Sequence, residues 1–132
     1  MDLDFVKQVQ RSTEKSFSAG LYCAESVALA LAKGQGIENE LFPKVATAFS
    51  SDMSCTCGTC GALTGAIMGV GLALGREKIG ESVQDSYEAT QKLVRDFEKE
   101  FGARYYHDLH SWGLESRHDV VQFADHPFGF RS

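Results

Sequence analysis

The fold depends on the stretch Ser54-Cys55-Thr56-Cys57-Gly58-Thr59-Cys60-Gly61-Ala62-Leu63-Thr64-Gly65, in which three cysteines within six residues lead into a glycine-rich apolar segment. From residue 61 to residue 74 only Thr64 is polar. This run of 14 residues is too short to cross a bilayer and suits a buried core helix. The stretch therefore predicts a glycine-rich helix in the centre of the molecule.

Three glycines recur every fourth residue along this helix, namely Gly61, Gly65 and Gly69. Each glycine inside a helix costs about 0.5–1 kcal/mol relative to alanine, so we expect something to approach this face closely. A neighbouring helix is the favoured interpretation. The alternatives are a cofactor, for which Gly61 and Gly65 would leave room beside the backbone, and a second copy of the chain.

The rest of the chain is expected to be helical too, because apolar residues recur at spacings of three and four and only two prolines occur. On the helix after Gly20 this spacing places Cys23 on the inward stripe with Val27, Ala30 and Leu31. On the last long helix the inward residues are expected to be Val83, Tyr87, Leu93, Val94, Phe97 and Phe101. The expected helices cover residues 3–17, 22–33, 40–49, 61–74, 80–101 and 114–124, with a polar loop at 50–54. The fold class is therefore all-α, a single-domain bundle over residues 1–132 of about five to six helices.

Composition and charge exclude several classes of protein. The 132 residues are 43% hydrophobic and 23% charged, which is typical of a globular domain. The net charge is -5 and the basic residues are scattered, so nucleic acid is not expected as a partner. The acidic N-terminus lacks signal-peptide features, and no membrane segment is found. We therefore expect a cytoplasmic protein, where thiols stay reduced and serve metal binding or redox chemistry more often than structural crosslinks.

The four cysteines of the chain are candidate metal ligands. Cys57 and Cys60 are spaced to reach one metal, Cys55 can add a third sulfur, and Cys23 can add a fourth from another helix. Four thiolates suit an iron–sulfur cluster or, as the alternative, zinc. A second interpretation makes Cys57 and Cys60 a thiol–disulfide exchange pair, with Cys23 or Cys55 as the resolving thiol.

Three segments carry a resemblance to a known family. They are Gly20-Leu21-Tyr22-Cys23-Ala24-Glu25-Ser26-Val27, Cys60-Gly61-Ala62-Leu63-Thr64-Gly65-Ala66-Ile67-Met68 and Gly71-Leu72-Ala73-Leu74-Gly75. They resemble the bacterial and archaeal C_GCAxxG_C_C family of redox-active proteins over about residues 5–123. The resemblance implies an all-helical domain, a bound prosthetic group such as an iron–sulfur cluster, and genes near oxidoreductases or transporters.

This chain departs from the family pattern in its cysteines. Cys23 and Cys60 match the first two cysteines of the family, whereas a tyrosine near Tyr106 stands in place of the third and His118 in place of the fourth. Cys55 and Cys57 are additions. We therefore expect the ligands to have been relocated within one site. His107 and His118 could also join a mixed metal site, although a surface or hydrogen-bonded histidine is the favoured interpretation.

These observations leave three functional hypotheses, of which the first is favoured. It is a small redox protein with a four-cysteine iron–sulfur site, acting in electron transfer or in support of a partner oxidoreductase. The second is the thiol–disulfide exchanger. The third is a helical interaction module without a cofactor, a homodimer whose aromatic C-terminus and glycine face bind a partner oxidoreductase. No catalytic set for hydrolysis can be assembled from the spacing, and whether the protein is an enzyme stays open.

Overall fold

The computed structural model describes residues 3–56 and 58–102, and within those ranges every regular element is a helix. This confirms the predicted all-α fold class. The elements are α1 (Leu3–Ala19), α2 (Cys23–Gly34), the 3-10 helix η1 (Lys44–Phe49), α3 (Ser50–Cys55), α4 (Gly61–Leu74) and α5 (Gln84–Phe101). None of the helices in the described part has both the length and the apolar character that a bilayer span requires.

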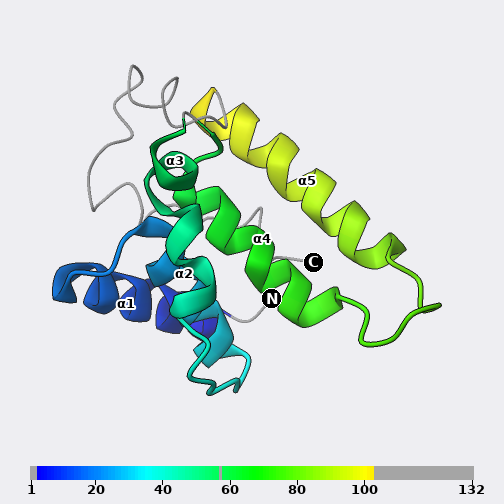
Figure 1. Cartoon of the computed structure of the whole chain (residues 1–132), viewed down its shortest axis with the longest axis horizontal. Coiled ribbons are helices and arrows are strands. Elements are labelled where there is room, and N and C mark those ends of the chain that lie inside the picture. Colours follow the sequence, from blue (N-terminus) through cyan, green and yellow to red (C-terminus); the bar gives the residue numbers. More distant parts are fainter. Residues whose placement is uncertain (1–2, 57, 103–132) are drawn as a thin grey trace.

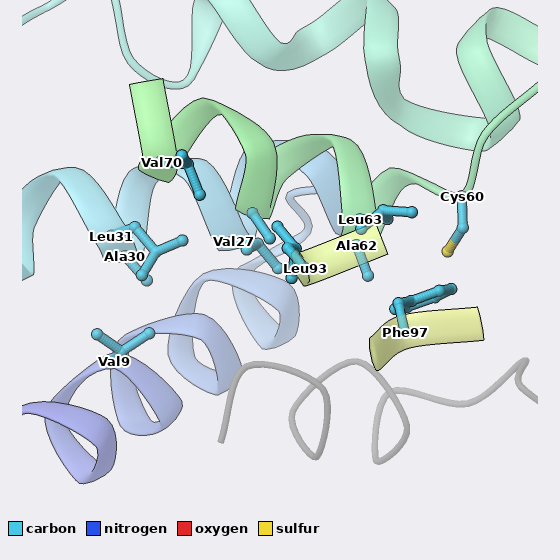
Figure 2. Close-up of a cluster of buried hydrophobic side chains, with 11 residues drawn as sticks. Val9, Val27, Ala30, Leu31, Cys60, Ala62, Leu63, Val70, Leu93 and Phe97 are labelled. Atoms are coloured by element: carbon cyan, nitrogen blue, oxygen red, sulfur yellow. The ribbon is translucent and has the colours of Figure 1, made fainter. Parts of the chain in front are cut away.

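The glycine-rich helix α4 lies in the centre, between α2 on one side and α5 on the other (Figure 1). Its bounds match the prediction, and residues such as Leu63, Ala66 and Val70 are almost completely buried. Val9 of α1 joins the same apolar cluster (Figure 2). The core therefore forms where α4 packs against α2 and α5, and α1 adds to it by packing against α2.

The glycine face of α4 packs directly against α2. A β-carbon built at Gly65 would lie 2.8 Å from the carbonyl oxygen of Ala24 and 3.0 Å from Cβ of Val27. One built at Gly69 would lie 2.6 Å from Cδ1 of Leu31. Real β-carbons do not come this close to other atoms. With a larger residue at either glycine position, α4 could not lie as close to α2 as it does. The favoured interpretation of the glycine spacing, a neighbouring helix, is confirmed.

Helix α5 covers α4 with one narrow stripe. Leu93 and Phe97 are fully buried, and the ring centroids of Phe97 and Phe101 lie 4.9 Å apart. The opposite face is solvated and carries the Lys92–Asp96 ion pair at 2.6 Å. The prediction that Tyr87 faces inward is wrong, because its side chain is 58% exposed. The first turns of α5 therefore extend beyond the region in which its apolar stripe meets the core.

The segment before the cysteines also differs from the prediction. An α-helix was expected from residue 40, but the chain turns there, and only the 3-10 helix η1 follows. The carboxamide oxygen of Asn39 accepts a hydrogen bond from the backbone N–H of Leu41 at 2.9 Å, which caps a local turn instead of a helix. The small alanine cluster formed by Ala24, Ala28 and Ala46 holds η1 against α2.

A short helix, α3, replaces the loop predicted at residues 50–54. Its backbone is left-handed, with φ values of 52, 60, 61 and 65° at Ser51, Met53, Ser54 and Cys55. This region costs about 1–2 kcal/mol for each residue with a side chain, which is why composition alone does not predict it. The helix predicted at 114–124 lies outside the described residues.

Candidate functional site

Two cysteines from different helices come together where α2 and α4 begin. Cys23 is the first residue of α2, and Cys60 is the residue that precedes and caps α4. A β-carbon at Gly61 would lie 3.1 Å from Cβ of Cys23, so the Cys60–Gly61 segment runs directly beside Cys23. Cys60 is 5% exposed, and Cys23 is partly buried against the same cluster. The start of each helix thus contributes one sulfur to a common place.

The side of this pair that faces α5 is apolar. Figure 2 shows the sulfur of Cys60 turned toward the ring of Phe97, which is itself fully buried. Phe101 packs against Phe97 in a tilted arrangement. The aromatic pair therefore keeps water away from the Cys60 sulfur on this side.

A buried carboxylate fixes the start of α2 and with it the position of Cys23. The backbone N–H of Tyr22 donates to Oε1 of Glu25 at 3.0 Å, and Oγ1 of Thr47 donates to Oε2 at 2.8 Å. The first bond satisfies a donor just before the helix begins, and the second joins α2 to η1. Because Glu25 is only 7% exposed, these bonds join the start of α2 to η1 in a region with little water.

Burial and the second cysteine both disfavour ionisation of Cys23. They raise the pKa of its thiol from 9.0 to about 12, with burial the larger cause and Cys60 the next, while a backbone hydrogen bond acts in the opposite direction. At neutral pH Cys23 is therefore a thiol. A thiolate forms there readily only when a metal cation replaces the proton.

The comparison with family models finds one match. The model described as "Putative redox-active protein (C_GCAxxG_C_C)" matches residues 21–124, which is more than half of the chain. The chain belongs to this family. Comparisons with curated proteins and with solved structures gave no match. Membership in the C_GCAxxG_C_C family supports a redox role, and the matched range includes both Cys23 and Cys60.

Of the other two cysteines of this C_GCAxxG_C_C protein, the structure describes only Cys55. Cys55 ends α3 and is exposed, and Cys57 lies outside the described residues, as do His107 and His118. Among the residues that the structure does describe, no group of three or more His, Cys, Asp or Glu side chains is arranged to hold a metal ion. The structure thus joins two of the four predicted ligands, and the four-cysteine centre stays a prediction.

The glycines beside the pair have a packing role that does not need a cofactor. Gly61 adjoins Cys23 and the backbone nitrogen of Ala24, which is 3.1 Å from the β-carbon position, and Gly65 adjoins the Ala24 carbonyl. Their predicted second role, in which Gly61 and Gly65 leave room for a cofactor, stays a prediction.

Two residues near the pair were not singled out from the sequence. Glu25 could have been found from its position three residues after Tyr22, which is the spacing of a helix-capping carboxylate. Ser26 is fully buried, and its hydroxyl has no hydrogen-bond partner. Nothing in the sequence distinguishes this serine from an exposed one, because burial depends on the packing of the whole bundle.

Proposed function

We propose that this chain is a small redox protein in which Cys23, Cys55, Cys57 and Cys60 hold an iron–sulfur cluster, for electron transfer or in support of a partner oxidoreductase. The observation that carries the proposal is the meeting of Cys23 and Cys60 at the starts of α2 and α4. When bound, the cluster supplies one-electron transfer chemistry. Cys55 and Cys57 precede Cys60 closely enough in the sequence to reach the same centre.

The chemistry of the two joined residues fits such a group. Thiolate sulfur is the donor that iron–sulfur clusters select, and both sulfurs stand at the positive ends of helices, which favour negative charge. The apolar cover from Phe97 and Phe101 keeps water from one side. Zinc is the alternative occupant, because it takes the same ligands.

The raised pKa of Cys23 favours a metal group over rapid thiol exchange. An exchange nucleophile needs an accessible thiolate near neutral pH, whereas Cys23 is partly buried and its pKa is about 12. A bound metal removes this obstacle because its positive charge deprotonates a coordinating thiol outright. The environment of the pair thus suits a sulfur that is ionised only by a bound cation.

Anaerobic purification tests the proposal directly. Iron and acid-labile sulfide should be found in the protein together with the visible absorption of a cluster, and Cys23→Ser or Cys60→Ser should abolish both. Ala66→Ser is the control, because it places a hydroxyl at a buried site of α4 without removing a sulfur. Cys55→Ser should also reduce the iron content if Cys55 is a ligand. Wild-type protein without iron or zinc would refute the proposal.

Thiol–disulfide exchange is a second candidate function. The closeness of Cys23 and Cys60 favours these two residues as the exchanging pair, in place of Cys57 and Cys60. Both thiols would be oxidised to one disulfide, releasing two protons, while a partner disulfide takes up the two electrons and becomes two thiols. Mass spectrometry after mild oxidation should then find a Cys23–Cys60 bond that dithiothreitol reverses. A Cys57–Cys60 bond would favour the pairing expected from the sequence, and a scrambled mixture would exclude both.

Two further parts of the proposal concern assembly and location. We propose a homodimer, which analytical ultracentrifugation would measure as twice the mass of 14.5 kDa. A cytoplasmic location follows from the same reasoning about reduced thiols, and cell fractionation would test it.

A further inference from the structure

One fully buried hydroxyl next to the cysteine pair has no partner. Ser26 lies in the first turns of α2 with 0% exposure, and its Oγ makes no hydrogen bond. Burying a hydroxyl without a partner is unfavourable, so such groups are rare in native proteins and each needs an explanation, of which a redox role or a bound ion is one. The residue is therefore a candidate for a hydrogen bond that forms in another state of the protein.

Helix geometry places this hydroxyl near Cys23. Ser26 follows Cys23 by three residues, so the two side chains are neighbours on the surface of α2. Side chains in a helix lean toward its N-terminus, which directs Ser26 toward the turn that carries Cys23. The carbonyl of Tyr22 on that turn accepts the backbone N–H of Ser26 at 2.8 Å, but it receives no bond from the hydroxyl.

The other buried hydroxyl on the adjoining helix is already satisfied. Oγ1 of Thr13 in α1 donates to the carbonyl oxygen of Val9 at 2.8 Å. Ser26 and Thr13 are equally buried, at 0% exposure, yet only Thr13 has an acceptor. A buried helical hydroxyl in this core can therefore bond to the carbonyl one turn back, and Ser26 does not do so; Ser50, at the start of α3, is the other buried hydroxyl without a partner among the described residues.

We propose that the Ser26 hydroxyl donates a hydrogen bond to the Cys23 sulfur when that sulfur is a metal-bound thiolate. The Ser26 hydroxyl makes no bond to sulfur in the structure, so its side chain or that of Cys23 must turn for the bond to form. An ionised sulfur accepts a hydrogen bond strongly and a thiol only weakly, so metal binding at Cys23 supplies the reason for this turn. Ser26 is a positioning residue, since it acts on the metal through Cys23. The inference rests on the proposed function, because it requires that Cys23 is a ligand.

Cobalt binding and heat stability together test the role of Ser26. Reduced, metal-free protein is titrated with Co²⁺ under anaerobic conditions, and the sulfur-to-cobalt charge-transfer absorption gives the Kd. Removing a hydrogen bond to a metal ligand weakens metal affinity roughly 10- to 100-fold, so Ser26→Ala should raise the Kd by about 10-fold. The same variant should raise the Tm of the metal-free protein, because it removes an unsatisfied hydroxyl.

A weaker affinity for Co²⁺ together with a higher Tm of the metal-free protein distinguishes this role from a merely structural one. Thr13→Val is the matched control: it should lower the metal-free Tm and leave the Kd for Co²⁺ within about twofold. Ser26→Thr keeps the hydroxyl and should bind Co²⁺ more tightly than Ser26→Ala. An unchanged Kd in Ser26→Ala would overturn the role of Ser26 while leaving the metal site standing. Wild-type protein that binds no Co²⁺ would overturn both proposals.

Discussion

Replacing Gly65 with alanine tests the close approach of α2 and α4, on which both the core and the cysteine pair depend. The new β-carbon would lie 2.8 Å from the Ala24 carbonyl oxygen, 3.0 Å from Cβ of Val27 and 3.2 Å from Cα of Ala24. Two of these atoms are backbone, so no rotation of a side chain relieves the contact. Overpacking a core in this way costs about 1–3 kcal/mol, and the better helix propensity of alanine returns about 0.5–1 kcal/mol.

The expected net result is a loss of about 1–2 kcal/mol in the free energy of unfolding. Urea denaturation followed by circular dichroism measures it. Gly71→Ala provides the control, because a β-carbon at Gly71 in the same helix meets nothing within 4 Å. That variant should gain about 0.5–1 kcal/mol from propensity alone. If Gly65→Ala were as stable as Gly71→Ala, the packing of the glycine face on α2 would be refuted.

Three further predictions concern the core, the thiol and the buried carboxylate. Phe97→Ala should cost about 3–5 kcal/mol of unfolding free energy in thermal or urea denaturation. Tyr87→Ala, at an exposed site, should change it by less than about 0.5 kcal/mol. Alkylation of Cys23 in reduced, metal-free protein should accelerate about tenfold per pH unit toward its pKa of about 12, and Cys60→Ser should shift this profile to lower pH. Because the folded pKa lies above the unfolded value of 9.0, the stability from the neutral thiol is complete below pH 9 and is lost as pH rises toward 12; a stability that increased over this window would contradict the assignment. Glu25→Ala should cost about 1–3 kcal/mol of unfolding free energy, since two donors lose their acceptor.

The sequence predicted the helices best where the burial of apolar residues alone decides the structure. The bounds of α4 followed from its nearly unbroken apolar run, and the inward stripe of α2 followed from spacings of three and four. Prediction failed where local and tertiary effects compete. The turn capped by Asn39 replaced the expected helix start, and α3 adopts a left-handed backbone that no residue type in it specifies. Tyr87 was misplaced because periodicity does not show where a long helix extends beyond its partner.

The candidate site was predictable only in part for a similar reason. The motifs around Cys23 and Cys60 indicated one shared centre, and the structure places these two residues side by side. Spacing alone favoured Cys57 as the partner of Cys60, because neighbours in sequence are easier to join than residues from separate helices. The complete burial of Ser26 and the missing hydrogen bond of its hydroxyl depend on the packed structure, which the sequence does not show.

The attachment of α5 bears on how the buried sulfur becomes accessible. In the described part of the chain, this helix packs on α4, and Leu93 and Phe97 are its only buried residues. A segment held by so few enclosed side chains is expected to detach in a partial opening while α2 and α4 stay joined. Its amides should then exchange with deuterium sooner than those of α4. Because Phe97 faces Cys60 (Figure 2), each such opening exposes the Cys60 sulfur briefly to solvent. The rate at which a thiol reagent labels Cys60 would therefore measure how often α5 detaches.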